Sequence, residues 1–140
     1  MNFFDTSVLV PAVRQVDARH PQSSALMRSA TPDRDATAAH ALTEVFSTLT
    51  RLPKGEWVPP APAQAIVADL SLRLTVVSLT AIETLGVIRD MSTTGLGGGM
   101  IYDAIILACA RKIRATATYT HNVKHFQRIA RDLADIIREP

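Results

Sequence analysis

The chain has 140 residues, of which 47% are hydrophobic and 20% are charged. This length and composition predict one globular domain, spanning residues 1–140, and exclude the disordered and collagen-like classes. The formal net charge is only +2 and there is one cysteine, so binding to phosphates is allowed but not required, and an intramolecular disulfide is excluded. No apolar run approaches the roughly 20 residues that span a bilayer. With no basic and apolar leader segment either, we expect a soluble, cytoplasmic protein without membrane contact.

The segment from Asn2 to Val10 predicts a short buried strand followed by a helix. Asp5 stands where the strand ends, and Thr6 and Ser7 follow it where they can cap the helix. In open α/β sheets, ligands bind beyond the carboxyl ends of the strands. Asp5 is therefore a candidate site residue, although carboxylates and hydroxyls also commonly serve only to hold a helix start.

Strands and helices alternate along the rest of the chain. Further strands are expected at 36–39, 75–79, 115–119 and 134–138, and further helices at 23–29, 40–52, 63–72, 100–113 and 123–130, with another helix beginning after Thr80. The strand at 75–79 is expected to be buried. The GLGGG sequence at 95–99 lacks the Lys and Ser/Thr of a phosphate-binding loop and is interpreted as a helix stop. The alternation predicts a three-layer α/β/α sandwich around a mostly parallel sheet.

Two acidic residues on predicted helices differ in their surroundings. Helical periodicity places Glu44 opposite the apolar face of its helix, beside Ser47 and Arg51, which is typical of a solvated glutamate. Asp103 instead lies in the first turn of a helix that is apolar almost all round. A half-buried carboxylate needs a partner, so Asp103 is the acid least well explained as a surface residue.

The strand predicted at 115–119 is followed by Thr120, His121 and Asn122, at the same sheet edge as Asp5. Basic residues from 111 to 131 either form a phosphate-binding rim or only solvate the surface. His121 and a second nearby histidine, His125, could donate a proton or contact a phosphate, and are interpreted by default as surface residues.

Four motifs in order carry a resemblance to a known family. They are DTSVLV around Asp5, AHALTEVFSTLTRLP around Glu44, IYDAIILACA around Asp103 and TYTHNVKHF around Asn122. In their order and spacing they resemble the PIN-domain ribonucleases, and among these the VapC toxins of type II toxin–antitoxin pairs. The resemblance implies a compact α/β/α sandwich, metal-dependent endonucleolytic cleavage of RNA, inhibition by a cognate antitoxin protein, and a homodimer.

The chemistry of the matched residues is consistent with that implication. Carboxylates that converge on one cleft repel one another, so such a cluster tends either to be protonated or to hold a cation. Mg²⁺ and Mn²⁺ are hard ions that prefer oxygen ligands and could activate water for attack on phosphorus. Asp5, Glu44 and Asp103 are the predicted catalytic residues. Asp5 and Asp103 are hypothesised as metal ligands, and Glu44 as a further ligand or the residue that orients the water. Thr6 or Ser7 would hold the scissile phosphate or a water.

One departure from the family pattern and two alternatives remain. Many PIN domains carry a fourth acid where this chain has the neutral Asn122, so either one or two metal ions could bind. A phosphoacceptor receiver domain would need paired acids at the first strand end and gives Asp103 no role. A PIN fold that binds RNA or protein without cleaving it is the other alternative, against which the intact acids argue.

Overall fold

The computed structural model describes residues 1–140 and contains a five-stranded sheet in the order β3-β2-β1-β4-β5. The strands are β1 (Asn2–Phe4), β2 (Asp35–Ala38), β3 (Thr75–Val77), β4 (Ala117–Tyr119) and β5 (Ile137–Arg138). Every neighbouring pair is parallel. The carboxyl ends of all five strands therefore meet at one edge of the sheet.

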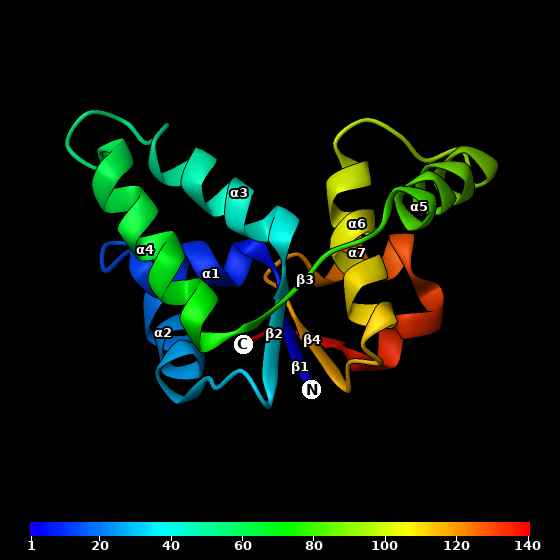
Figure 1. Cartoon of the computed structure of the whole chain (residues 1–140), viewed down its shortest axis with the longest axis horizontal. Helices are drawn as coiled ribbons and strands as arrows, with labels where there is room; N and C mark the ends of the chain where they lie inside the picture. Colours follow the sequence, from blue (N-terminus) through cyan, green and yellow to red (C-terminus); the bar gives the residue numbers. More distant parts are fainter.

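Helices cover both faces of this sheet (Figure 1). They are α1 (Thr6–Val13), α2 (His20–Ser29), α3 (Ala39–Leu49), α4 (Pro60–Arg73), α5 (Ala81–Thr93), α6 (Met100–Lys112) and α7 (Val123–Ile129), with a 3₁₀ helix η1 (Arg131–Ile136). In Figure 1, α1 to α4 lie on one side of the strands and α5 to α7 on the other. This arrangement confirms the predicted α/β/α sandwich. None of the helices combines the length and the apolar character that a membrane crossing requires.

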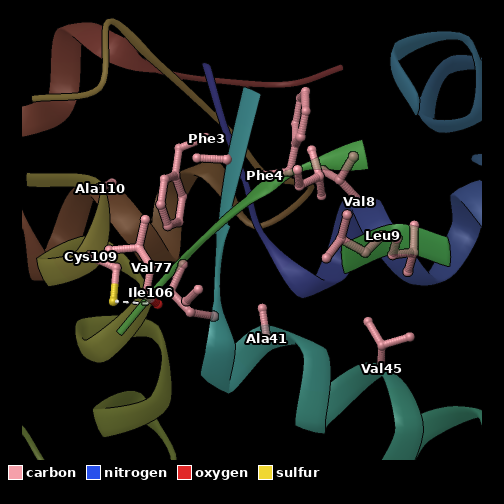
Figure 2. Close-up of a cluster of buried hydrophobic side chains, with 14 of the residues drawn as sticks. Phe3, Phe4, Val8, Leu9, Ala41, Val45, Val77, Ile106, Cys109 and Ala110 are labelled. Carbon is pink, nitrogen blue, oxygen red and sulfur yellow. Dashed lines mark hydrogen bonds between the residues drawn. The ribbon is translucent and has the colours of Figure 1, made fainter. Parts of the chain in front are cut away.

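The central strand β1 is apolar on both of its faces. Phe3 and Phe4 are fully buried, and because side chains alternate along a strand they point to opposite sides of the sheet. Figure 2 shows Phe3 directed toward Cys109 and Ala110 of α6, and Phe4 directed toward Val8 of α1. A strand covered by helices on both faces is expected to be continuously hydrophobic. This burial fixes the position of Asp5, which follows directly.

The two edge strands differ from the sequence expectations. The segment 75–79 was expected to be buried, but it forms only β3, in which Val76 is 39% exposed. Position at the edge of the sheet explains the exposure, because an edge strand has a neighbour on one side only. At the other edge, much of the predicted strand 134–138 is the 3₁₀ helix η1, and only two residues pair as β5.

The turn between α5 and α6 confirms the predicted helix stop. Gly95 and Gly98 have φ angles of +68° and +62°. Backbone in this left-handed region strongly favours glycine, so these residues allow the chain to leave α5 and enter α6 at a sharp angle. The turn delivers α6 with Asp103 in its first turn.

Candidate active site

One pocket, of about 290 Å³, lies beyond the carboxyl ends of the central strands. Ten residues line it, and they include every site residue predicted from sequence: Asp5, Thr6, Ser7, Glu44, Asp103 and Asn122. These residues come from α1 and its cap, from α3, from α6 and from the cap of α7. The fold thus brings together side chains that are far apart in the sequence: Asp5 and Asn122 are separated by 122 − 5 = 117 positions.

Asp5 is held rigidly at the bottom of this arrangement and is only 2% exposed. It is the N-cap of α1, and its Oδ2 accepts hydrogen bonds from the Ser7 amide (3.2 Å), the Ser7 hydroxyl (2.6 Å) and the Thr120 hydroxyl (2.8 Å). Thr6 and Ser7 lie inside the helix, so the expectation that they cap it is wrong. Burial raises the pKa of Asp5, and the hydrogen bonds from Ser7 and Thr120 oppose that shift.

Asp103 lies on α6 and is paired with a histidine. Its Oδ2 is 2.6 Å from Nδ1 of His125, and its side chain is 21% exposed. Burial raises the pKa of Asp103, the negative charge of Asp5 raises it further, and the contact with His125 lowers it. The pocket therefore places Asp103 where the negative charge of Asp5 disfavours its own charge, which a cation would relieve.

Glu44 does not behave as the solvated glutamate that periodicity predicts. Its Oε2 accepts a 2.7 Å hydrogen bond from the Thr6 hydroxyl, and its side chain is 31% exposed. Helical periodicity describes only where Glu44 lies relative to the apolar face of its own helix. It cannot show that the first turn of α1 lies against the opposite side of α3, and this packing turns Glu44 into the pocket.

The donor set in the pocket suits a hard divalent cation. The hydrogen bonds described for Asp5 and Asp103 all involve Oδ2, which leaves Oδ1 of each carboxylate available. No group of three acidic, histidine or cysteine side chains is close enough to coordinate one ion together. Mg²⁺ commonly uses only one or two protein carboxylates and keeps several waters. Direct contacts from Asp5 and Asp103, with Glu44 in reach through water, would fit this preference.

The expected basic rim is divided between two surfaces. The Arg111 guanidinium is engaged by Asp132 at 2.8 Å and lies over a pocket formed with α5. Lys124 lies elsewhere, in a hollow that it shares with Arg138 beyond the end of β5. The basic residues of 111–131 therefore do not form one continuous rim, because α6 and α7 present Arg111 and Lys124 in different directions, and a phosphate contact by Lys124 stays open.

Thr120 and His125 are outside the predicted set of site residues, and the structure connects both to the acids. Thr120 follows β4, and β4 pairs with β1, so the residues directly after the two strands are neighbours. Only the strand order, which the sequence pattern does not give, shows this adjacency. His125 was interpreted as a surface residue, but the packing of α7 against α6 brings it to Asp103.

Comparisons with known proteins agree with this architecture. The family model of the PIN domain matches residues 3–132. The chain is 29% identical over 111 residues to ribonuclease VapC27 of Mycobacterium tuberculosis, covering 79% of this chain and 77% of that protein. It is similar to the crystal structure of VapC20 of Mycobacterium tuberculosis, a sarcin-ricin loop cleaving toxin, with a TM-score of 0.72 and 25% identity over 89% of this chain and 92% of that one. It also shares its fold with VapBC2 from Rickettsia felis, solved on a DNA fragment from the promoter, with a TM-score of 0.65 and 19% identity over 99% and 98% of the two chains. The family match spans all four motifs identified in the sequence.

Proposed function

Because the chain belongs to the PIN domain family, we propose that it is a metal-dependent endoribonuclease that hydrolyses RNA phosphodiester bonds. The observation that carries this proposal is the convergence of Asp5, Glu44 and Asp103 on one pocket. The similarity of the chain to a ribonuclease and to a sarcin-ricin loop cleaving toxin supports the same activity. The chain would act as a single PIN-like domain and as the toxin of a toxin–antitoxin pair.

Asp5 and Asp103 would hold Mg²⁺ or Mn²⁺ through their available oxygens, Oδ1 of each side chain. Such an ion polarises the scissile phosphate and makes an attacking water more acidic. The hydrogen bonds from Ser7 and Thr120 keep the Asp5 carboxylate in one orientation before substrate arrives. Because this orientation exists before binding, little reorganisation is needed during the reaction.

Glu44 would orient the attacking water and accept its proton. Its Oε2 is already occupied by the Thr6 hydroxyl, so Oε1, which lies 3.9 Å from Nε2 of His40, is the oxygen that remains for water. Thr6 is therefore a positioning residue that selects which oxygen of Glu44 faces the substrate. Asn122, the neutral residue at the pocket edge, can donate or accept a hydrogen bond to the phosphate without adding negative charge.

Two protein partners belong to this proposal. A cognate antitoxin would bind the chain and inhibit it, as the VapBC-type assemblies among its structural relatives suggest. A second copy of the chain would form a homodimer. Both partners can be tested by measuring the mass of the purified protein alone and after coexpression with the protein encoded beside it.

The activity is tested by incubating purified protein with a panel of structured RNAs and Mg²⁺ or Mn²⁺, with a chelator as control. Asp5→Asn is the test variant, since it keeps the shape of the side chain and removes its charge. Asp135→Asn is a matched control, because Asp135 is exposed on η1 and does not line the pocket.

We expect cleavage by the wild type and by Asp135→Asn, and its loss with the chelator and in Asp5→Asn. Cleavage that survives both the chelator and Asp5→Asn would show that the acids and a metal are not required. A wild type that binds RNA but cleaves nothing across the panel would favour the non-catalytic module.

A further inference from the structure

We propose that a second hollow, beside the pocket of acids, binds the phosphate backbone of the RNA next to the cleaved bond. This inference rests on the proposed function and identifies where the substrate strand runs. We call it the basic hollow, defined by Lys124 and Arg138 together with His121, Asn122 and His125. Its volume is about 640 Å³, so it is larger than the pocket of acids.

The basic hollow adjoins the pocket of acids through one shared residue. Asn122 lines both of them. His125 lines the basic hollow and also contacts Asp103 at 2.6 Å. A strand whose scissile phosphate lies over Asp5 and Asp103 can therefore extend across Asn122 and His125 without leaving the surface.

The position of the hollow follows from the sheet topology. Lys124 lies in the first turn of α7, directly after β4, and Arg138 is the last residue of β5. The Thr120 amide donates a 3.0 Å hydrogen bond to the Arg138 carbonyl, which fixes the two chain segments against each other. Both cations therefore lie at or beyond the carboxyl ends of β4 and β5, and the acids lie beyond the carboxyl ends of strands in the same sheet.

The cations of the basic hollow are free of internal partners. Lys124 and Arg138 are exposed, and neither forms an ion pair or a side-chain hydrogen bond in the structure. Glu139 is the only acid that lines the hollow. By contrast Arg19, the cation that lines the pocket of acids, is held by both oxygens of Asp17.

This distribution of charge matters because the acids repel RNA. Asp5, Glu44 and Asp103 place up to three negative charges where a phosphate must bind, and Arg19 offsets them little while it is paired with Asp17. Unpaired cations immediately beside the acids supply the attraction that the pocket lacks. We therefore assign Lys124 and Arg138 to phosphates that flank the scissile one.

The lining favours backbone phosphates over bases. Val123 is the only hydrophobic residue in the lining, which holds no Phe, Tyr or Trp, so the only rings on which a base could stack are the imidazoles of His121 and His125. Contacts to phosphates position a strand but carry no sequence information. The basic hollow should therefore raise the affinity for RNA of any sequence and leave cleavage-site preference to other surfaces.

The test measures RNA binding without catalysis. Binding of a fluorescent single-stranded RNA is followed by anisotropy in chelator over a range of salt concentrations. The test variant is Lys124→Gln/Arg138→Gln. The charge-matched control is Arg34→Gln/Arg114→Gln, because Arg34 and Arg114 precede β2 and β4 and lie at the opposite edge of the sheet.

Each phosphate contact on a single strand contributes about 0.7 to the slope of log K against log salt. The slope of the test variant is expected to be smaller by about 1.4. When salt is raised from 50 to 200 mM, the wild type should therefore lose affinity by a factor about sevenfold larger than the factor for the test variant. Its affinity at low salt should be on the order of tenfold weaker. Lys124→Arg should restore the contribution of that position, and the control pair should bind as the wild type does.

Two failures are distinguishable. If the slope of log K against log salt is the same for the wild type, the control and Lys124→Gln/Arg138→Gln, the basic hollow is not a phosphate subsite. The proposed nuclease function then still stands. If the wild type binds no RNA at any salt concentration in chelator, the subsite is overturned, and the cleavage assay with Mg²⁺ or Mn²⁺ tests the nuclease function separately.

Discussion

Replacing Thr118, on β4, and Thr120, directly after β4, by valine should change the free energy of unfolding in opposite directions. Thr118 and Thr120 are both fully buried. The Thr120 hydroxyl donates to Asp5 at 2.8 Å and accepts from the Asn122 amide at 3.0 Å. The Thr118 hydroxyl has no hydrogen-bond partner. Thr→Val keeps the shape of the side chain and replaces the hydroxyl by a methyl group at each site.

The expected sizes follow from these contacts. A hydrogen bond to a charged acceptor contributes about 1.5–3 kcal/mol and a neutral one about 0.5–1.5 kcal/mol, so Thr120→Val should lower the free energy of unfolding by about 2–4.5 kcal/mol. A buried hydroxyl without a partner costs roughly 1–3 kcal/mol, so Thr118→Val should raise the free energy of unfolding by up to that amount. Thr120→Val should also lose RNA cleavage, because Asp5 loses one of the groups that orient it.

Urea denaturation at pH 7 in chelator, followed by circular dichroism, measures both changes. The slope m should stay constant in each variant, so that a shift in midpoint reports stability alone. Equal destabilisation by the two substitutions would contradict the reasoning, since it would show that the volume of the core and not the support of Asp5 determines the effect.

Three further predictions concern the acids and the buried thiol. Asp103→Asn should stabilise the metal-free protein, because the raised pKa of Asp103 means that folding disfavours its charge. The gain in free energy of unfolding should be largest at neutral pH and vanish toward pH 3.8. A pH-independent difference between variant and wild type would contradict this. Thr6→Val should lower kcat by roughly tenfold, because Glu44 loses its 2.7 Å donor, and unchanged kcat would remove Thr6 from the site. Its urea midpoint should fall less than that of Thr120→Val, because the Glu44 side chain is 31% exposed and water can replace the lost donor. Cys109 is 1% exposed and burial raises its pKa to about 11, so a thiol reagent should label it only after unfolding, and rapid labelling of the native protein would refute its burial.

The sequence was sufficient to predict the elements that depend on local pattern. The apolar run ending at Asp5 predicted β1, and the apolar helix carrying Asp103 predicted a half-buried acid, because burial of a strand or helix leaves a periodicity that can be counted. The helix expected after Thr80 is α5, and Thr80 and Glu83 form a capping box at its start, with both partners within one turn.

What the sequence could not show depends on how elements pack against one another. Glu44 has the periodicity of a solvated residue, and only the crossing of α1 and α3 gives it Thr6 as a partner. The contact of His125 with Asp103 likewise requires the packing of α7 against α6. The exposure of Val76 depends on β3 being an edge strand, which is a property of strand order. Resemblance to a family supplied the grouping of the acids, which periodicity alone would have missed.

The central claim is that the acids Asp5, Glu44 and Asp103 direct water, and not a ribose hydroxyl, to attack phosphorus. A single-turnover cleavage in water enriched in oxygen-18, followed by mass spectrometry of the products, tests this directly. We predict that the terminal phosphate of the product carries one oxygen from solvent. A 2′,3′-cyclic phosphate without solvent oxygen would contradict the claim, because the attacking group would then be the 2′-hydroxyl of the RNA itself.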